Sequence, residues 1–238
     1  MQPRSSQPSD LAKPSWSASL SEEIEFDAVF FDFDGVLIVS EPIWWTVIEE
    51  VLGERGRAIR VRVNGLKLSE AIRLQVPDNE ELAAWAEDEV RKRAVPRIKD
   101  ESQLTDEEWI PRVLDQISEK GIKIGVVSSS DWDLVHDVLT RQNILGYFSE
   151  IVGGDDKHVK KGKPAPDAYK VAARRVGVSD RSRCCAVEDS ASGIEAAVAA
   201  GMYVVQFVMK DDRADSLAVS FPDAGRIILG DAELRLDT

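Results

Sequence analysis

The sequence has few cysteines, and none of them is placed so that it could form a structural disulfide bond. The chain of 238 residues has two cysteines, Cys184 and Cys185, which are neighbours. Adjacent cysteines almost never form a structural disulfide, because the bridge is strained. We therefore exclude a disulfide-stapled secreted fold, and we expect both thiols to be buried in a cytoplasmic protein.

Positive charge is also scarce. The chain has 30 Lys and Arg against 43 Asp and Glu, which gives a formal net charge of −13. Such a chain repels polyanions at long range, so we expect no nucleic acid partner. The same field repels a phosphorylated metabolite. A phosphate site in this protein must therefore be locally positive or contain a metal ion.

Long apolar runs are missing as well. No run approaches the roughly 18 residues that a membrane-spanning helix needs, so we expect no membrane partner. The N-terminal segment is rich in Ser and Pro and lacks the apolar core of a secretory signal. We predict a disordered leader over 1–22. A transit peptide, with only Arg4 and Lys13 as cations, is the less favoured alternative.

The chain does have a set of short apolar runs that are rich in β-branched and aromatic residues. Continuous runs of this length are typical of strands buried on both faces of a parallel sheet. The clear runs are Ala28–Phe33, Ile122–Val127, Cys184–Val187 and Tyr203–Val208, and the weaker ones are Ile151–Val152 and Arg226–Leu229. Amphipathic helical patterns lie between them. This alternation predicts an α/β fold with a doubly wound, Rossmann-like parallel sheet.

The stretch from about 40 to 107 interrupts the alternation. It has no good strand pattern, and it contains helix-like segments at Ile43–Leu52, Ser69–Gln75 and Glu80–Val95. We therefore predict an inserted α-helical cap over 40–107 and a core formed by 23–39 and 108–238. The cap would lie over the carboxyl ends of the strands, where ligands bind in open α/β sheets.

Four acidic residues follow two of the predicted strands. Asp32 and Asp34 end the first strand, and side chains at i and i+2 project to the same side. Glu188 and Asp189 follow the run CCAV. If both strands are central and adjacent, four carboxyl groups converge, and such hard oxygen ligands suit Mg²⁺. Taken singly, the pairs read equally well as an Asp-Gly turn and an acid-rich helix start.

Two further features could bind phosphate. Ser128 and Ser129 follow the strand at 122–127, where hydroxyls and exposed N–H groups beside a helix start can bind phosphate oxygens. Lys163 precedes Pro164 and is therefore expected in a loop ahead of the next helix. Taken alone, these residues are equally consistent with a capping loop and a solvated lysine.

Together these features resemble a known family. The motifs DFDGV, a serine at the end of the next core strand, KPAPD and EDSASG occur in the order and at the spacing of the haloacid dehalogenase (HAD) superfamily. The stretch from about Phe26 to Gln206 is similar to the β-phosphoglucomutase and phosphoglycolate phosphatase branch, whose members have a helical cap after the first strand. The resemblance implies a phosphoric monoester hydrolase that acts on a small phosphorylated metabolite.

The resemblance also implies roles for the matching residues. Asp32 matches the nucleophile that forms an aspartyl-phosphate, and Asp34 matches the general acid and base. Ser128 and Lys163 match groups that bind the phosphate, and Ser129 directly follows Ser128 in the sequence. The implied magnesium site comprises Asp32, Asp34 through its backbone carbonyl, Glu188 and Asp189.

The predicted cap departs from the family pattern. Mutase-type members carry a His and an Arg that grip a sugar phosphate, and this chain has Trp44 and Leu68 there. We therefore favour a phosphatase over a sugar phosphate mutase. A non-catalytic regulator that kept the fold is a third hypothesis, which the intact acidic motifs oppose. Lys67 is the nearest cap cation that could reach a substrate, and His136 and His158 match no catalytic position. The sequence does not predict the oligomeric state.

Overall fold

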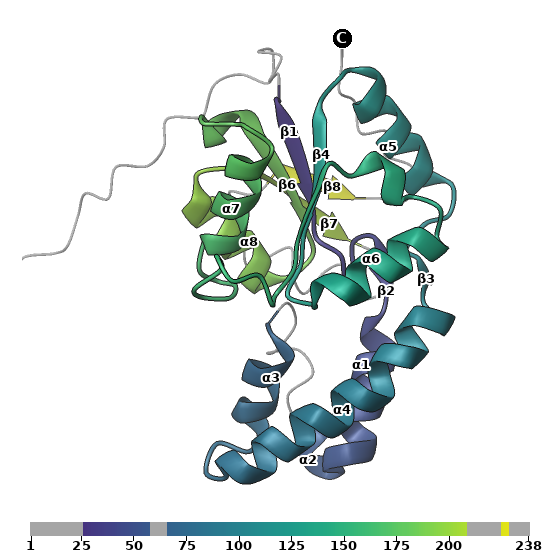
Figure 1. Cartoon of the computed structure of the whole chain (residues 1–238), viewed down its shortest axis with the longest axis vertical. Helices are drawn as coiled ribbons and strands as arrows, with labels where there is room; N and C mark the ends of the chain where they lie inside the picture. Colours follow the sequence, from purple (N-terminus) through teal and green to yellow (C-terminus); the bar gives the residue numbers. More distant parts are fainter. Residues whose placement is uncertain (1–25, 58–65, 209–224, 229–238) are drawn as a thin grey trace, which may run out of the picture.

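The computed structural model of the chain describes residues 26–57, 66–208 and 225–228 (Figure 1). Within these residues, six parallel strands form one sheet with the order β5-β4-β1-β6-β7-β8. Their bounds are β1 Ala28–Phe31, β4 Lys123–Val127, β5 Glu150–Val152, β6 Cys184–Glu188, β7 Tyr203–Val208 and β8 Gly225–Ile228. This confirms the predicted α/β class and its parallel sheet.

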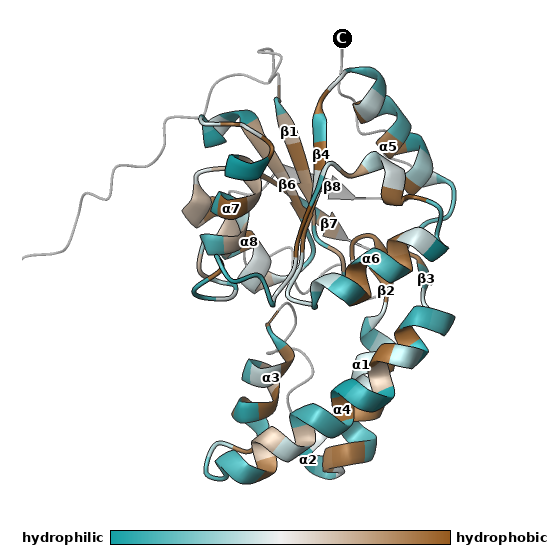
Figure 2. Ribbon diagram, viewed as in Figure 1, coloured by the Kyte–Doolittle hydropathy of each residue, from teal (hydrophilic) through white to brown (hydrophobic). Residues whose placement is uncertain are grey.

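Strand β1 lies at the centre of the sheet, paired with β4 on one side and with β6 on the other. All four of its residues are buried. Phe30 belongs to the cluster of apolar residues on one face and Phe31 to the cluster on the other, because successive side chains in a strand alternate. Figure 2 shows β1 and β4 as mostly apolar, which a strand covered on both faces requires.

Helices cover both faces of the sheet. Helices α5 (Trp109–Glu119) and α6 (Trp132–Arg141) pack against one face, and α7 (Asp167–Arg175) and α8 (Ala191–Ala200) pack against the other. Short 3-10 turns, η2 (Leu145–Tyr147) and η3 (Arg181–Arg183), precede β5 and β6. The arrangement confirms the doubly wound sheet predicted from the alternation of strands and helices.

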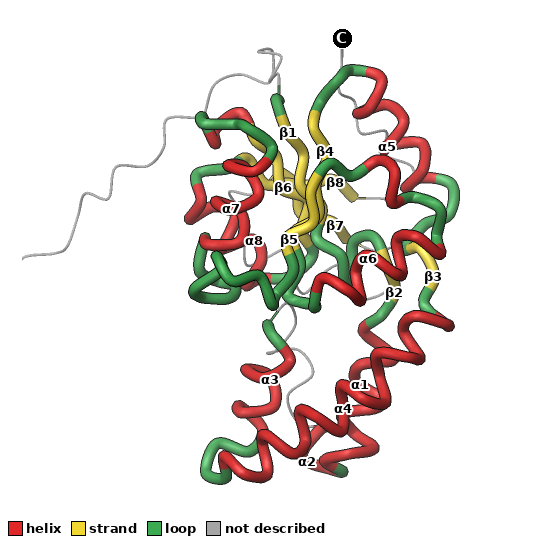
Figure 3. Tube along the Cα trace, in the orientation of Figure 1, coloured by secondary structure: helices red, strands yellow, loops and turns green. Residues whose placement is uncertain are grey.

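A helical region is inserted between β1 and α5 (Figure 3). It contains α1 (Glu41–Leu52), α2 (Glu54–Arg57), α3 (Leu68–Gln75) and α4 (Glu80–Glu101). Two short antiparallel strands, β2 (Ile38–Val39) and β3 (Gln103–Leu104), pair at its two ends. The sequence did not predict β3, because two residues are too few to show a strand period.

Helix α4 is longer than the predicted segment, which ended at Val95. It continues through Pro96 to Glu101. Proline inside a helix removes one backbone donor and leaves a carbonyl one turn earlier without its partner. Both Pro96 and Lys92, which carries that carbonyl, are exposed, so water can satisfy it.

Ion pairs hold the inserted region against the core. Arg91 on α4 binds Asp131 at the start of α6, and Lys99 binds Asp137 at 2.5 Å. Arg141 on α6 donates to the backbone carbonyl of Ser102 at the end of α4. These contacts fix α4 along α6, and they place the helices of the insert beside the carboxyl ends of the central strands.

Several predicted boundaries differ from the observed ones, and some lie outside the described residues. Strand β1 ends at Phe31 and not at Phe33, so Asp32 follows the strand. Strand β6 includes Glu188, which the prediction placed after it. The predicted leader over 1–22 and residue Leu229 lie outside the described part, and the division at 23–39, 40–107 and 108–238 stays a prediction. Among the helices described here, none is long and apolar enough to cross a bilayer.

A matched pair of leucines tests the core. Leu114 on α5 is fully buried, whereas Leu74 on α3 is 53% exposed. We expect Leu114→Ala to lower the free energy of unfolding by about 2–5 kcal/mol, because it removes apolar contacts and leaves a cavity. Leu74→Ala should change it by less than about 0.5 kcal/mol. Urea unfolding followed by circular dichroism measures both, and similar values for the two variants would contradict the described packing.

Candidate active site

The predicted site residues lie at one edge of the sheet, where three neighbouring parallel strands end. Asp32 follows β1, Ser128 follows β4, and Glu188 is the last residue of β6. Because β4, β1 and β6 are adjacent and parallel, their carboxyl ends meet at this edge. Lys163 reaches the same place from the loop before α7.

Lys163 is the centre of a buried ion cluster. Its Nζ donates to Asp32 Oδ1 at 2.7 Å, to Glu188 Oε1 at 2.5 Å and to the backbone carbonyl of Val127 at 3.1 Å. The side chains of Lys163, Asp32 and Glu188 are at most 4% exposed. A buried ammonium needs this many acceptors to offset the loss of water.

Glu188 is held on both of its carboxylate oxygens. Besides Lys163, Oε1 accepts a hydrogen bond from the hydroxyl of Tyr169 on α7 at 2.5 Å, and Oε2 accepts one from Ser190 at 3.2 Å. Gly193 in the first turn of α8 makes room for this carboxylate, because a Cβ there would lie 2.1 Å from it. Glu188 therefore fixes Lys163 in place.

Asp189 completes a group of carboxylates. One ligand atom each from Asp32, Glu188 and Asp189 lie within 4.8 Å of one another. Asp189 Oδ1 is buried and has no hydrogen-bond partner among the described residues. Gly35, at φ +86°, lets the turn after β1 approach Asp189, since a Cβ there would lie 2.3 Å from Oδ2.

The cluster is short of positive charge, since three carboxylates face one lysine. Burial, and then the charge of Glu188, raise the pKa of Asp32 to about 8 against the opposing effect of Lys163. Burial, followed by the charges of Asp32 and Glu41, raises the pKa of Asp189 well above its usual value. Burial alone would lower the pKa of Lys163, but the carboxylates of Asp32 and Glu188 outweigh it and raise that pKa.

These residues fit a divalent metal ion. A cation would satisfy the unpartnered Oδ1 of Asp189 and balance the excess negative charge of the three carboxylates. Their ligand atoms are hard oxygens, which Mg²⁺ prefers over softer ligands. The predicted acidic metal site is thus supported by burial and by charge, as well as by proximity.

Asp34 is surrounded by hydrogen-bond donors and lies outside this carboxylate group. Oδ2 accepts a hydrogen bond from Ser130 at 2.7 Å, with Ser128 at 3.5 Å. Oδ1 accepts hydrogen bonds from Ser40 and from the indole N–H of Trp44, the latter at 3.3 Å. Trp44 belongs to α1, so a residue of the insert contacts an acidic residue of the core.

The structure therefore brings together the predicted acidic residues, Ser128 and Lys163, in two adjoining groups. Several partners were not predicted in these roles: Tyr169, Ser190, Ser40, Ser130 and the indole of Trp44. The sequence did contain one signal for Tyr169, because it is an aromatic residue in the otherwise small and polar segment PAPDAYK. The serine contacts depend on how separate loops approach, which the sequence does not show.

A cavity of about 280 Å³ opens from Asp32 and Asp34 toward the insert. Ser129 and Ser130 from the core and Lys67 from the insert line it. Lys67 Nζ donates to the backbone carbonyl of Gly154 at 2.5 Å, so this cation bridges the insert and the core. Trp44 and Trp45 both line the cavity, and both also pack against the main apolar core.

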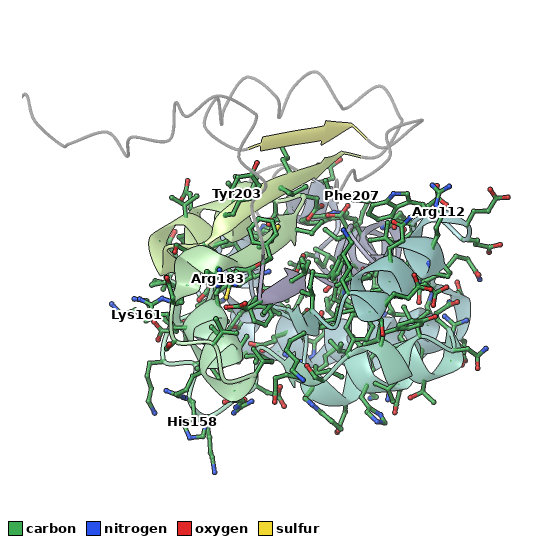
Figure 4. All side chains as sticks on the ribbon, turned by 90° about the horizontal axis from the view of Figure 1, so that it is seen from above. Arg112, His158, Lys161, Arg183, Tyr203 and Phe207 are labelled. Atoms are coloured by element: carbon green, nitrogen blue, oxygen red, sulfur yellow. The ribbon has the colours of Figure 1, made fainter. Side chains whose placement is uncertain are left out.

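Neither histidine belongs to the site. His158 lies at the outer edge of the molecule, near Lys161 (Figure 4), and its side chain is 49% exposed. His136 stacks on Trp132 of α6, with 4.6 Å between the ring centroids. Neither histidine is among the residues that line the cavity or form the carboxylate group in the described part.

Comparison with known proteins identifies the class of enzyme to which this arrangement belongs. The model of the haloacid dehalogenase-like hydrolase family matches residues 26–201. A probable pseudouridine-5'-phosphatase of Drosophila melanogaster is 32% identical over 74% of this chain and 78% of that protein. The β-phosphoglucomutase of Bacillus subtilis is 31% identical over 75% of this chain and 81% of that protein.

The fold gives the same result. A putative haloacid dehalogenase-like hydrolase from Bacteroides fragilis, known from its crystal structure, superposes with a TM-score of 0.72 at 22% identity, over 86% of this chain and 97% of that one. The chain belongs to the haloacid dehalogenase-like hydrolase family. This confirms the resemblance predicted from the motifs, and with it the assignment to the phosphoric monoester hydrolases of the family.

A lysine pair tests the ion cluster. We expect Lys163→Met to lower the free energy of unfolding by about 3 kcal/mol, because it leaves Asp32 and Glu188 buried without their cation. Lys161→Met, an exposed lysine of the same loop, should have little effect. Chemical unfolding of the two variants in the absence of divalent ions measures the difference. Equal stability would show that the buried lysine does not compensate the carboxylates.

Proposed function

We propose that this protein is a Mg²⁺-dependent phosphatase that hydrolyses a small phosphorylated metabolite through an aspartyl-phosphate on Asp32. The observation that carries the proposal is the position of Asp32 at the end of the central strand. Lys163 lies 2.7 Å from one of its oxygens, and Asp189 lies within the same carboxylate group. Asp34 lies two residues further along the chain and lines the same cavity as Asp32.

In the first step, a carboxylate oxygen of Asp32 attacks the phosphorus of the ester. A bond forms between Asp32 and phosphorus, and the bond between phosphorus and the ester oxygen breaks. Asp34 gives its proton to the departing oxygen, which leaves as an alcohol. Proton transfer of this kind contributes about 10²–10⁴-fold to the rate.

In the second step, a water molecule attacks the phosphorus of the aspartyl-phosphate. Asp34, now ionised, takes the proton from this water, and the bond between Asp32 and phosphorus breaks. Inorganic phosphate is released and the Asp32 carboxylate is restored. Hydrogen bonds from Ser40, Ser130 and Trp44 hold the Asp34 carboxyl group in place at the cavity.

Two kinds of group would hold the transferred phosphoryl. Lys163 supplies a fixed positive charge beside Asp32, and Ser128 and Ser129 supply hydroxyl groups at the end of β4. Asp32 and Asp189 would hold Mg²⁺, with the Asp34 backbone carbonyl as a further ligand. When bound, the ion supplies positive charge that offsets repulsion between the phosphate and the carboxylates. Because both oxygens of Glu188 are engaged, we assign it to holding Lys163.

The relatives support this reaction. One relative is a probable pseudouridine-5'-phosphatase, and the other is a β-phosphoglucomutase. A mutase remains the alternative, and formation of glucose 6-phosphate from β-glucose 1-phosphate, in place of phosphate release, would favour it. The Trp44 indole, at a position where mutases are expected to have a histidine, supports the phosphatase. The cytoplasm stays our expected compartment.

The nucleophile can be tested with a near-isosteric pair. We expect Asp32→Asn to fold normally and to lose turnover of phosphate esters by at least about 10³-fold, because the amide cannot form the acyl phosphate. Asp133→Asn, at an exposed position of α6, serves as the control and should keep full activity. Release of inorganic phosphate from a panel of esters is the measurement. Residual activity within tenfold would exclude Asp32 as the nucleophile.

The metal can be tested by removal and return. We expect a chelator to abolish phosphate release and added Mg²⁺ to restore it, because the carboxylates of Asp32 and Asp189 repel a phosphate dianion without a cation. Isothermal titration with Mg²⁺ should show binding that Asp189→Asn weakens. Turnover that persists in chelator would rule out the metal. No turnover of any ester with Mg²⁺ present would favour the non-catalytic regulator.

A further inference from the structure

The walls of the cavity beyond the carboxylates are mainly apolar. Two tryptophans from α1 lie on this side, with aliphatic residues from α1, α6, α3 and the segment that leads into α3. The main ones are Trp44, Trp45, Ile48, Leu66, Leu68 and Leu134. The part of a substrate that extends from the phosphate toward the insert therefore meets apolar surface, and two indole rings supply most of its planar area.

The position of the Trp44 indole ring is fixed by a hydrogen bond to Asp34. Trp44 donates its indole N–H to Asp34 Oδ1 at 3.3 Å, so its ring stands beside the group proposed to protonate the leaving oxygen. Trp45 follows it on the same helix, and both pack against the main apolar core. A ring anchored in this way presents preformed surface, which costs little entropy on binding.

The cations that line the described part of the cavity are already engaged by the protein. Lys67 donates to the Gly154 carbonyl, and its stem lies against Gly162, where a Cβ would be 3.0 Å from Lys67 Cε. Arg91 pairs with Asp131, and also with Glu87 at 3.2 Å. Glu41 adds a further carboxylate to the same lining. A second anionic group on a substrate would have to approach this carboxylate.

We propose that this site selects phosphate monoesters whose leaving group is uncharged and carries an apolar or planar face, which packs against Trp44 and Trp45. The inference rests on the proposed phosphatase function and narrows its substrate class. Such a group gains contact with the indoles, whereas a carboxylate or second phosphate at the same place meets Glu41. The cavity of about 280 Å³ is large enough for a ring or a short chain beside the phosphate.

Three esters whose leaving groups differ in charge and in apolar surface test the proposal on the full-length protein with Mg²⁺. Benzyl phosphate carries a planar apolar group, 2-hydroxyethyl phosphate a small neutral one, and phosphoglycolate a carboxylate. We expect kcat/KM for benzyl phosphate to exceed that for 2-hydroxyethyl phosphate by about tenfold, since an apolar group in a fitted pocket is worth that much or more. Phosphoglycolate should lie below 2-hydroxyethyl phosphate by roughly tenfold, because of like-charge repulsion.

Variants then assign the two effects to residues. Trp45→Ala should reduce the ratio of benzyl to 2-hydroxyethyl phosphate toward unity. Trp85→Ala, which removes a tryptophan of α4 that is 51% exposed, should leave the ratio unchanged. Glu41→Gln should raise the relative kcat/KM of phosphoglycolate several-fold. The wild-type ratios stand as an independent readout if Trp45→Ala does not fold.

The outcomes separate the two proposals. The predicted order of esters, with collapse of the benzyl preference in Trp45→Ala, supports the inference. Turnover with phosphoglycolate as the best ester, or a benzyl preference that Trp45→Ala does not alter, overturns the inference and leaves the phosphatase proposal standing. Absence of turnover with all three esters and with a broader panel overturns the phosphatase proposal, and the inference with it.

Discussion

A single buried lysine that pairs with two buried carboxylates, with a third carboxylate close to them, is the constraint on which the rest of the site depends. Asp32 comes from the central strand, Glu188 from its neighbour, and Lys163 from a loop that leads into α7. An unpaired charge at this depth would cost several kcal/mol, so each of the three segments stabilises the arrangement of the other two. Tyr169 adds its hydroxyl to Glu188, which ties helix α7 into the same network.

The same cluster explains why the protein can act on a phosphate although its overall charge is negative. The field of the whole chain repels anions, so in the proposed mechanism local positive charge comes from Lys163 and from a metal ion that the remaining carboxylate oxygens would hold. Both of these positive charges interact with the phosphoryl group. The cavity beyond them has an apolar wall and acidic residues, which suits the uncharged part of a molecule.

The sequence predicted those features that repeat or that lie close together along the chain. The buried strands could be predicted because each is a continuous apolar run. The two pairs of acidic residues could be predicted as site residues because each follows such a run. Tyr169, Ser40 and Ser130 could not be assigned their partners, because each meets a carboxylate from a distant segment. Strand β3 was not predicted because two residues are too few to show a strand period. The extension of α4 past Pro96 was not predicted because proline usually ends or kinks a helix.

The ribbon of β2 and β3 gives the insert a particular kind of independence. The chain leaves the core at Val39 and returns at Gln103, and these two residues face each other across the ribbon. A segment whose ends already meet can change in length and composition without altering the path of the strands on either side. The catalytic residues at the sheet edge and the substrate specificity set by the insert can therefore change separately during evolution. The β2–β3 ribbon is the boundary between these two parts of the chain.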